Sequence, residues 1–287
     1  MNLLKVGGAL LALGLAVSNA YAAEPSKGKV LVVMSSAKTL DLKEGKTYET
    51  GYYLNELATP LKAIVDAGYT PVFADPQGNE PQMDVSSNND MFFDKDAAKR
   101  EEALKFVASF DGLKHPLKLS AVAAKGTSEY KGLFMPGGHA PMQDLMKDKD
   151  LGKILTQFHS TGRPTGIICH GPIALLAAAH DPVALDKALI SGDDNAVKSL
   201  AKGWPYAGYK VSVFSKGEEQ QLEPGQLKGS VLFYNDDALA KAGAVVDNGE
   251  AWKPHVVVDR ELVTAQQPFS DHEFGQKLVA ALNAKSH

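Results

Sequence analysis

Apolar and polar positions near the start of the chain alternate in the manner of a βαβ unit. A continuous apolar run bounded by Lys29 and Met34 is typical of a strand buried in a parallel sheet. Across Tyr52–Ala67 the leucines and isoleucines recur with helical spacing, and Gly68 ends this pattern as a common residue after a helix. A second apolar run at Thr70–Ala74 predicts the next strand, so the first 75 residues or so predict strand, helix and strand.

The same alternation continues to the end of the chain. Residues 75–95 are rich in Asp, Asn, Pro, Gln and Ser, and they predict a long irregular segment. Further helices are expected at Asp96–Phe110, Leu151–Ser160, Gly171–Ala179 and Phe274–Ala284, and further strands at Gly132–Met135, Thr165–Cys169, Tyr209–Phe214 and Val256–Val258. Strands alternating with helices favour an α/β fold in which helices cover both faces of a mostly parallel sheet.

One long segment, 181–208, has only weak patterning. We expect it to form a lid or an excursion near the functional site. No repeat, low-complexity linker or second domain is evident, so residues 23–287 are expected to form a single domain.

The N-terminus has the pattern of a cleaved signal peptide. Lys5 supplies a small positive region, and the apolar run Val6–Val17 is too short to cross a bilayer, which needs about 20 residues. Ala20 and Ala22 occupy the two small-residue positions before a cleavage site. We therefore expect residues 1–22 to be removed, the mature protein to be periplasmic or secreted, and no integral membrane segment to remain after processing.

Composition narrows the classes of function. Hydrophobic residues are 44% and charged residues 22% of the chain, which is ordinary for a globular protein. The formal net charge is −4, and no basic cluster is present, so the sequence gives no reason to expect nucleic-acid binding. A single cysteine excludes an internal disulfide, and an unpaired thiol in an exported protein must be buried or useful.

That cysteine, Cys169, lies at the junction of a predicted strand and a predicted helix. Residues 165–172 read TGIICHGP, and Pro172 occupies a first helical position, where its missing N–H is not needed. A strand-to-helix turn of this kind is the geometry of a nucleophile elbow at the carboxyl edge of a sheet. A nearby helix N-terminus would favour the thiolate and lower the pKa of the thiol. The alternative is a small buried core residue, the common fate of free cysteines.

Two other segments are weak signals of function when taken alone and become informative only together with this turn. Phe134–His139 is an apolar strand that ends in two glycines, and backbone N–H groups at such glycines can bind an oxyanion. Taken alone, the same residues also describe an ordinary turn. Glu56 is an acid on a mostly apolar helix, and such residues are usually exposed to solvent.

Together these segments resemble the PfpI / DJ-one superfamily, nearest to its glyoxalase III and heat-inducible chaperone members. The resemblance rests on Thr50–Pro60, Pro136–Leu145, Ile168–Pro172 and Leu262–Pro268, which follow one another in the family's order. It implies a class I glutamine amidotransferase-like domain, that is, a flavodoxin-like three-layer sandwich with a nucleophile elbow. In true glutamine amidotransferases the catalytic His and Glu come late in the chain, whereas His170 follows the cysteine here, so glutamine hydrolysis is not expected.

The resemblance implies roles for individual residues. Cys169 matches the nucleophile, His170 the base beside it, and Glu56 a buried, protonated acid that hydrogen-bonds the sulfur. The third member of the triad matches a carboxylate after a later strand, where Glu219 is favoured and Glu218 is the alternative. Oxyanion donors and substrate-binding residues correspond to Gly137, Gly138, His139 and Gly171, together with the backbone of His170.

The expected activity is a cofactor-free, cysteine-dependent reaction on small reactive carbonyls, such as conversion of 2-oxoaldehydes to 2-hydroxy acids, or a related deglycase or hydrolase reaction. An amidase or peptidase using the same Cys-His site is an alternative. So is a non-enzymatic stress protein, either a redox-sensing thiol or a holdase chaperone with a client protein. A homodimer is compatible with the resemblance. No metal is expected, because five other histidines lack metal-ligand spacing: His115, His159, His180, His255 and His287.

Overall fold

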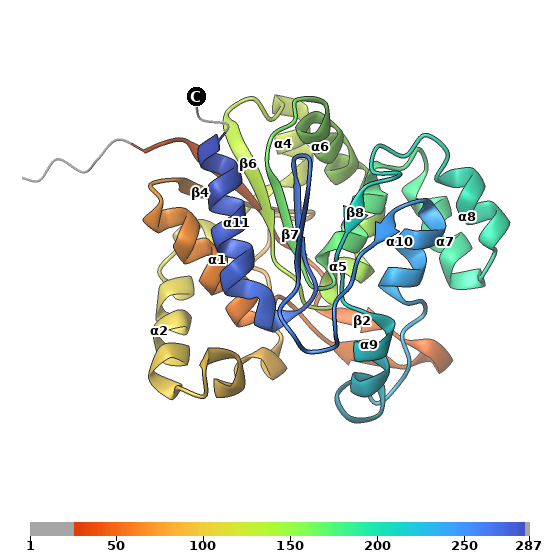
Figure 1. The fold of residues 1–287 in the computed structure, drawn as a ribbon, viewed down its shortest axis with the longest axis horizontal. Helices are drawn as coiled ribbons and strands as arrows, with labels where there is room; N and C mark the ends of the chain where they lie inside the picture. The colour runs from red at the N-terminus through yellow and green to blue at the C-terminus, as the bar shows by residue number, and fades with distance from the viewer. Residues whose placement is uncertain (1–25, 285–287) are drawn as a thin grey trace, which may run out of the picture.

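The structure, a computed structural model, describes residues 26–284, so the predicted signal peptide at 1–22 lies outside the described residues. Its centre is a seven-stranded sheet in the order β10-β11-β7-β6-β1-β4-β5, and every neighbouring pair is parallel except β10 with β11 (Figure 1). The strands are β1 (Lys29–Val33), β4 (Thr70–Asp75), β5 (Leu117–Lys118), β6 (Tyr130–Met135), β7 (Thr165–Ile168), β10 (Val256–Asp259) and β11 (Leu262–Ala265). The predicted flavodoxin-like α/β fold is therefore confirmed.

Helices cover both faces of this sheet, as the alternation of side chains along β1 requires. Val30 and Val32 face one apolar cluster, while Leu31 and Val33 face the other, since successive side chains of a strand point to opposite faces. The first cluster lies under α1 (Leu54–Asp66), α2 (Ala97–Ala108) and α11 (Asp271–Ala284). The second lies under α4 (Leu119–Lys125), α6 (Lys149–Ser160), α7 (Pro182–Ser191), α8 (Asp194–Leu200) and α10 (Asn235–Ala242).

Smaller elements complete the fold. They are the hairpin of β2 (Thr39–Asp41) and β3 (Thr47–Glu49), the ladder of β8 (Lys210–Val211) and β9 (Val245–Val246), and the short helices α3 (Asp111–Lys114), α5 (Ala140–Gln143) and α9 (Lys216–Leu222). The sequence pattern predicts an irregular segment at 75–95, and there the chain forms only two short 3₁₀ turns, Val85–Ser87 and Asp90–Phe93. The expected helix after Cys169 is a 3₁₀ segment, Gly171–Ala178.

The predicted strand Tyr209–Phe214 is wrong for most of its length. Only Lys210 and Val211 pair as a strand, and their partner is β9 rather than the central sheet. The N–H of Ser212 donates to the side-chain hydroxyl of Thr264 (2.9 Å) instead of to a backbone carbonyl, so the ladder ends there. An apolar run therefore marks a buried segment correctly without marking its hydrogen-bonding partners.

The expectation that 181–208 forms a lid is also wrong. Trp204 and Tyr206 are buried in the cluster under α6, α7 and α10, where the Trp204 indole donates to Leu175 O (2.8 Å) and the Tyr206 hydroxyl donates to Leu155 O (3.2 Å). Large aromatic side chains whose polar atoms are hydrogen-bonded are stable in a core. This segment extends the helical layer beside α10, at one side of the molecule (Figure 1).

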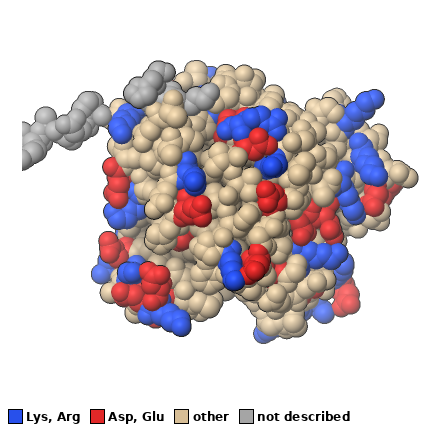
Figure 2. Space-filling view, in the orientation of Figure 1, with Lys and Arg blue, Asp and Glu red and all other residues tan. Residues whose placement is uncertain are grey.

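The surface charges are mixed. On the face seen in Figure 2, Lys and Arg side chains are interspersed with Asp and Glu, and neither sign forms a continuous stripe. Within residues 26–284 no helix has both the length and the apolar character needed to cross a bilayer.

Candidate active site

Cys169 forms the turn that follows β7. Its φ is 65°, a left-handed conformation that costs a non-glycine residue about 1–3 kcal/mol and must be held by its surroundings. Two backbone hydrogen bonds hold it, because Cys169 N donates to Ala265 O (2.8 Å) and Phe214 N donates to Cys169 O (2.9 Å). The turn thereby has the geometry of a nucleophile elbow, with the side chain buried at the sheet's carboxyl edge.

The sulfur faces the histidine next to it in the chain. Cys169 Sγ lies 3.2 Å from His170 Nδ1, and His170 Nε2 lies 2.7 Å from Glu219 Oε2. The imidazole also stacks on the Phe214 ring, with centroids 4.2 Å apart. Packing and hydrogen bonding together orient the ring, so that its Nδ1 is directed at the thiol.

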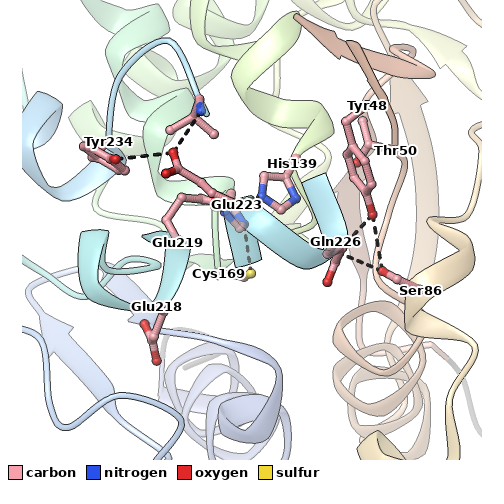
Figure 3. Close-up of polar contacts among 12 residues, drawn as sticks. Tyr48, Thr50, Ser86, His139, Cys169, Glu218, Glu219, Glu223, Gln226 and Tyr234 are labelled. Atoms are coloured by element: carbon pink, nitrogen blue, oxygen red, sulfur yellow. Dashed lines mark hydrogen bonds and ion pairs between the residues drawn. The ribbon is translucent and has the colours of Figure 1, made fainter. Parts of the chain in front are cut away.

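Adjacent glutamates on α9 point in different directions (Figure 3). Glu219 reaches the two histidines, whereas Glu218 accepts hydrogen bonds from Ser215 at the start of α9 in a capping box. Between the alternatives that the sequence left open, Glu219 is the one that contacts His170.

Glu219 has a second imidazole partner, His139. Its Oε1 lies 2.8 Å from His139 Nε2, and the rings of His139 and His170 lie 3.9 Å apart. A carboxylate only accepts hydrogen bonds, so both Nε2 atoms donate to it, and neutral His170 presents the lone pair of Nδ1 to the thiol. The glycine motif predicts a functional His139, but its pairing with Glu219 has no signal in the sequence, since 80 residues separate the two.

Electrostatic interactions favour the charged forms of Glu219 and His139 and the neutral form of His170. Burial opposes the charge on Glu219, but the two histidines outweigh burial and lower the pKa of Glu219 below its ordinary value. Burial likewise opposes the cation on His139, but Glu219 outweighs it and raises the pKa of His139. Burial and the neighbouring His139 lower the pKa of His170 to about 4. At neutral pH His170 is therefore a neutral base beside the thiol.

The expected low pKa of the thiol is contradicted. Burial and the adjacent Glu56 raise the pKa of Cys169 well above its ordinary value, and the backbone N–H groups of Gly138 and His170 only partly offset this. Burial also raises the pKa of Glu56 to about 8, although interactions with Cys169 and Gly137 oppose the rise. The reason is that the helix N-terminus after Cys169 is a short 3₁₀ segment within the core, so burial outweighs its dipole.

Glu56 is fully buried rather than exposed to solvent. It lies in the first turn of α1, and neither carboxyl oxygen has a hydrogen bond of ordinary geometry with the described residues. A neutral carboxyl beside the sulfur is the state that burial favours.

The glycines predicted to bind an oxyanion permit close approach of the chain. At Gly137 a Cβ would collide with Glu56 and Cys169, and at Gly138, whose φ is 93°, it would collide with the backbone of Gly51. The backbone of Gly138 lowers the pKa of Cys169, as an N–H group close to the sulfur would, and such a group could serve as an oxyanion donor. At Gly171 a Cβ would meet Ile167 instead, so this glycine serves packing beneath the turn.

A small pocket of about 80 Å³ is lined in part by Cys169, His139 and His170. Its walls come from segments that the sequence did not connect with the site: Phe92 in the irregular segment, Leu222 and Gln226 in and after α9, and Trp252 after β9. Gln226 connects two of the walls, since its amide nitrogen lies within hydrogen-bond distance of the hydroxyl oxygens of Tyr48 and Ser86 (Figure 3) and of Tyr53. The residues that line the pocket include no Lys or Arg.

Only one group of side chains in the described part of the chain has the composition and spacing to hold a metal ion. It consists of His139, His170 and Glu219, whose ligand atoms lie within 4.8 Å of one another. Their two N–H···O hydrogen bonds of 2.7 and 2.8 Å account for this spacing.

Comparison with known proteins relates this geometry to a family. Residues 48–182 match the sequence model of the DJ-1/PfpI family. The chain resembles this family over that segment, which is just under half of its length. The matched residues include Glu56, His139, Cys169 and His170, whereas Glu219 lies beyond them, so its place in the site rests on geometry.

Individual relatives cover nearly all of the chain. It is 28% identical over 268 residues to a protein/nucleic acid deglycase HchA of Staphylococcus aureus strain JH9, across 92% of this chain and 82% of that one. In structure it resembles glyoxalase III from Candida albicans, with a TM-score of 0.66 and 23% identity over 90% of this chain and 98% of that one. The Rapid Encystment Protein 24 KDa of Francisella tularensis gives a TM-score of 0.64 and 24% identity over 89% and 99%. The two structural likenesses support the family's fold.

Proposed function

We propose that this protein is a cofactor-free enzyme that converts small 2-oxoaldehydes to 2-hydroxy acids through Cys169. The observation that carries the proposal is the Sγ–Nδ1 distance of 3.2 Å between a strained, buried thiol and a neutral imidazole inside a small pocket. A curated relative named as a protein/nucleic acid deglycase supports chemistry at a carbonyl carbon. The expected class of reaction is therefore covalent catalysis by a thiol.

In the first step the thiol adds to the aldehyde. The S–C bond forms while His170 Nδ1 takes the thiol proton, and the carbonyl electron pair becomes an alkoxide that His170 then protonates. The product is a hemithioacetal. The backbone N–H groups of Gly138 and His170, which lower the pKa of Cys169 before reaction, are candidates to stabilise the alkoxide.

In the next steps a proton moves between adjacent carbons. His170 takes the proton from the former aldehyde carbon, giving an enediolate. It returns this proton to the neighbouring carbon while the hydroxyl proton of the first carbon passes to the oxygen of the second, giving a thioester of the 2-hydroxy acid. Water hydrolyses this thioester and restores the thiol. The sum is 2-oxoaldehyde plus water giving 2-hydroxy acid, with no net oxidation.

The test is turnover of methylglyoxal to lactate by the protein without its first 22 residues. Cys169→Ser retains the shape of the side chain but replaces the thiol by a poorer nucleophile, so the rate should fall at least about 10³-fold. Absence of lactate with the unsubstituted protein, or equal rates for the two proteins, would exclude the proposal. The high pKa of the thiol predicts that alkylation by iodoacetamide still accelerates above pH 9.

A second candidate, a redox-sensing thiol, has one observation in its favour. The neutral carboxyl of Glu56 beside Cys169 is able to donate a hydrogen bond to a sulfinate oxygen. The raised pKa of the thiol opposes it, because the thiol form oxidises slowly. Intact mass after mild peroxide separates the two: a stable adduct of two oxygens without lactate formation would favour the sensor.

We further propose that the protein acts after export, on the basis of residues 1–22. Expression of the full chain followed by separation of periplasmic and cytoplasmic fractions tests this. A mature N-terminus at residue 23 in the periplasmic fraction is the expected result, and an uncleaved cytoplasmic product would contradict it.

A further inference from the structure

We propose that Trp252, held by Glu218, limits the size of molecule that reaches Cys169, so that the pocket takes short, uncharged carbonyl compounds. The chemical class rests on the proposed function, but the limits on size and charge rest on the pocket alone. The two adjacent glutamates of α9 then have different roles. Glu219 orients the base, and Glu218 orients a wall of the pocket.

Glu218 is fully buried and accepts four hydrogen bonds. Its Oε2 accepts from Ser215 N (3.0 Å), Ser215 Oγ (2.7 Å) and Gln266 Nε2 (3.0 Å). Its Oε1 accepts from Trp252 N (2.8 Å). One oxygen thus anchors α9 to the sheet region, and the other anchors the backbone of the loop that carries Trp252.

Trp252 needs such an anchor because its backbone is in an unfavourable conformation. Its φ is 62°, in the left-handed region that a bulky residue seldom adopts. The indole N–H donates to Gln221 Oε1 (2.8 Å), and the indole ring meets Phe214 edge to face with centroids 5.7 Å apart. Since Phe214 itself stacks on His170, Trp252 extends the wall that begins at the catalytic imidazole.

The pocket's volume and lining define what fits. About 80 Å³ holds only a few water molecules, so a chain of two or three carbons fits and a phenyl ring does not. Phe92, another residue of the lining, packs edge to face against Tyr53 with ring centroids 5.6 Å apart, which holds this part of the wall in place. The lining has no Lys or Arg, and its one charged imidazole, His139, is already neutralised by Glu219, so a phosphate or a second carboxylate would be desolvated without a free cationic partner.

A substitution of Glu218 has a specific physical consequence. In Glu218→Gln one oxygen becomes an NH₂ group, which cannot accept a hydrogen bond. Three donors face Oε2 and one faces Oε1, so the amide nitrogen is best placed at Oε1, against Trp252 N–H. This change should release the Trp252 loop and leave the start of α9 intact.

Alkylation of the single cysteine measures access without requiring turnover. The ratio of rates for N-phenylmaleimide and N-methylmaleimide, each normalised to glutathione, cancels the reactivity of the thiolate and reports the size of the opening. We expect the ratio to rise at least tenfold in Trp252→Ala and about threefold in Glu218→Gln. Glu250→Gln is the matched control, since this exposed carboxylate lies on the same loop and pairs only with Lys253.

Equal ratios in the unsubstituted protein and Trp252→Ala would overturn the inference about size. If Glu218→Gln fails to fold by circular dichroism, Glu218→Asp retains the acceptors but withdraws them by one methylene, and it should raise the ratio as well. An unchanged ratio in the folded Glu218 variant would overturn its role. For charge, iodoacetate should react at least tenfold more slowly than iodoacetamide after the same normalisation, and equal rates would contradict the limit to uncharged molecules.

The enzymatic readout keeps this inference separate from the proposed function. Methylglyoxal should be turned over more than tenfold faster than phenylglyoxal, and Trp252→Ala should narrow that ratio. If alkylation shows the expected size limit while no lactate forms, the pocket inference holds and the proposed reaction fails. If lactate forms but the alkylation ratios are equal, the reaction holds and the role of Trp252 fails.

Discussion

The candidate site has two parts, one made of uncharged groups and one made of charged groups. The groups that touch the sulfur are held neutral: the pKa of Cys169 is raised well above its ordinary value, that of Glu56 is raised to about 8, and that of His170 is lowered to about 4. One residue further out, Glu219 and His139 are held charged, because each stabilises the other across 2.8 Å.

The difference shows how a buried site can hold a reactive thiol and also contain ionised groups. An isolated thiolate in this pocket would have to overcome the full cost of desolvation, so the nucleophile rests as a thiol and loses its proton only when it attacks. The His139–Glu219 pair remains ionised since its members neutralise one another. Glu219 thereby orients His170 without making it a cation, and the charge on His139 keeps His170 unprotonated.

The largest effect should follow removal of the neutral base. His170→Asn leaves an amide that is unable to take the thiol proton, so kcat/KM for methylglyoxal should fall about 10²–10⁴-fold. Alkylation of Cys169 should slow in parallel near pH 7, where the neighbouring base assists loss of the proton. A variant that retains more than a tenth of the activity would show that His170 is not the base.

A smaller loss is expected when the charged pair loses its anion. In Glu219→Gln one oxygen becomes an NH₂ group that opposes the Nε2–H of His139 or His170, so the ring orientation and tautomer of one imidazole must change. We expect kcat to fall roughly 10²-fold, less than the about 10⁴-fold that the Asp-to-Asn change costs in a Ser-His-Asp triad. Glu219→Asp, which retains the charge, should recover part of that loss, and equal activity of the Asp and Gln variants would argue against an electrostatic role.

Removing the cation should act mainly through pH. His139→Asn retains a donor for Glu219 but removes one of the two causes that lower the pKa of His170, the other and larger one being burial, so the pKa of His170 should rise above about 4. Protonated His170 cannot act as a base, and the loss of activity therefore moves to higher pH. At pH 5 the unsubstituted enzyme should be close to its plateau, whereas the variant should retain a clearly smaller fraction of its own plateau. Identical pH profiles of kcat/KM would show that the two imidazoles are not coupled.

The sequence predicted those parts of the site that are local in the chain. The strand, the turn and the Gly-Pro pair around Cys169 are contiguous, so both the elbow and the adjacent His170 could be inferred from one short segment. The glycines at 137 and 138 could also be inferred, because a close approach of backbone requires them. The parallel sheet followed from the alternation of apolar runs with helical periodicity, which the structure confirms.

Contacts between distant segments could not be predicted in this way. His139 and Glu219, or Glu218 and Trp252, meet only after folding, and neither pair leaves a periodic signal. The segment 181–208 was expected near the site because it lacks periodicity, but burial of Trp204 decides its position instead. The wall residue Phe92 lies in a polar, irregular stretch, where a single aromatic residue has no pattern to mark it.

The last prediction concerns stability rather than activity and tests the neutral state of Glu56. Its raised pKa means that the folded protein binds this proton more tightly than the unfolded chain, so the contribution to stability is complete below about pH 4.5 and declines as pH rises toward 8. Glu56→Gln is neutral at every pH and nearly isosteric, so it removes this decline. Near pH 7 the variant should be more stable by about 3 kcal/mol, and near pH 4 the two proteins should unfold alike. Urea unfolding at both pH values measures the difference. A gain at pH 4 as large as that at pH 7 would show that packing is responsible, and that Glu56 is ionised beside the thiol.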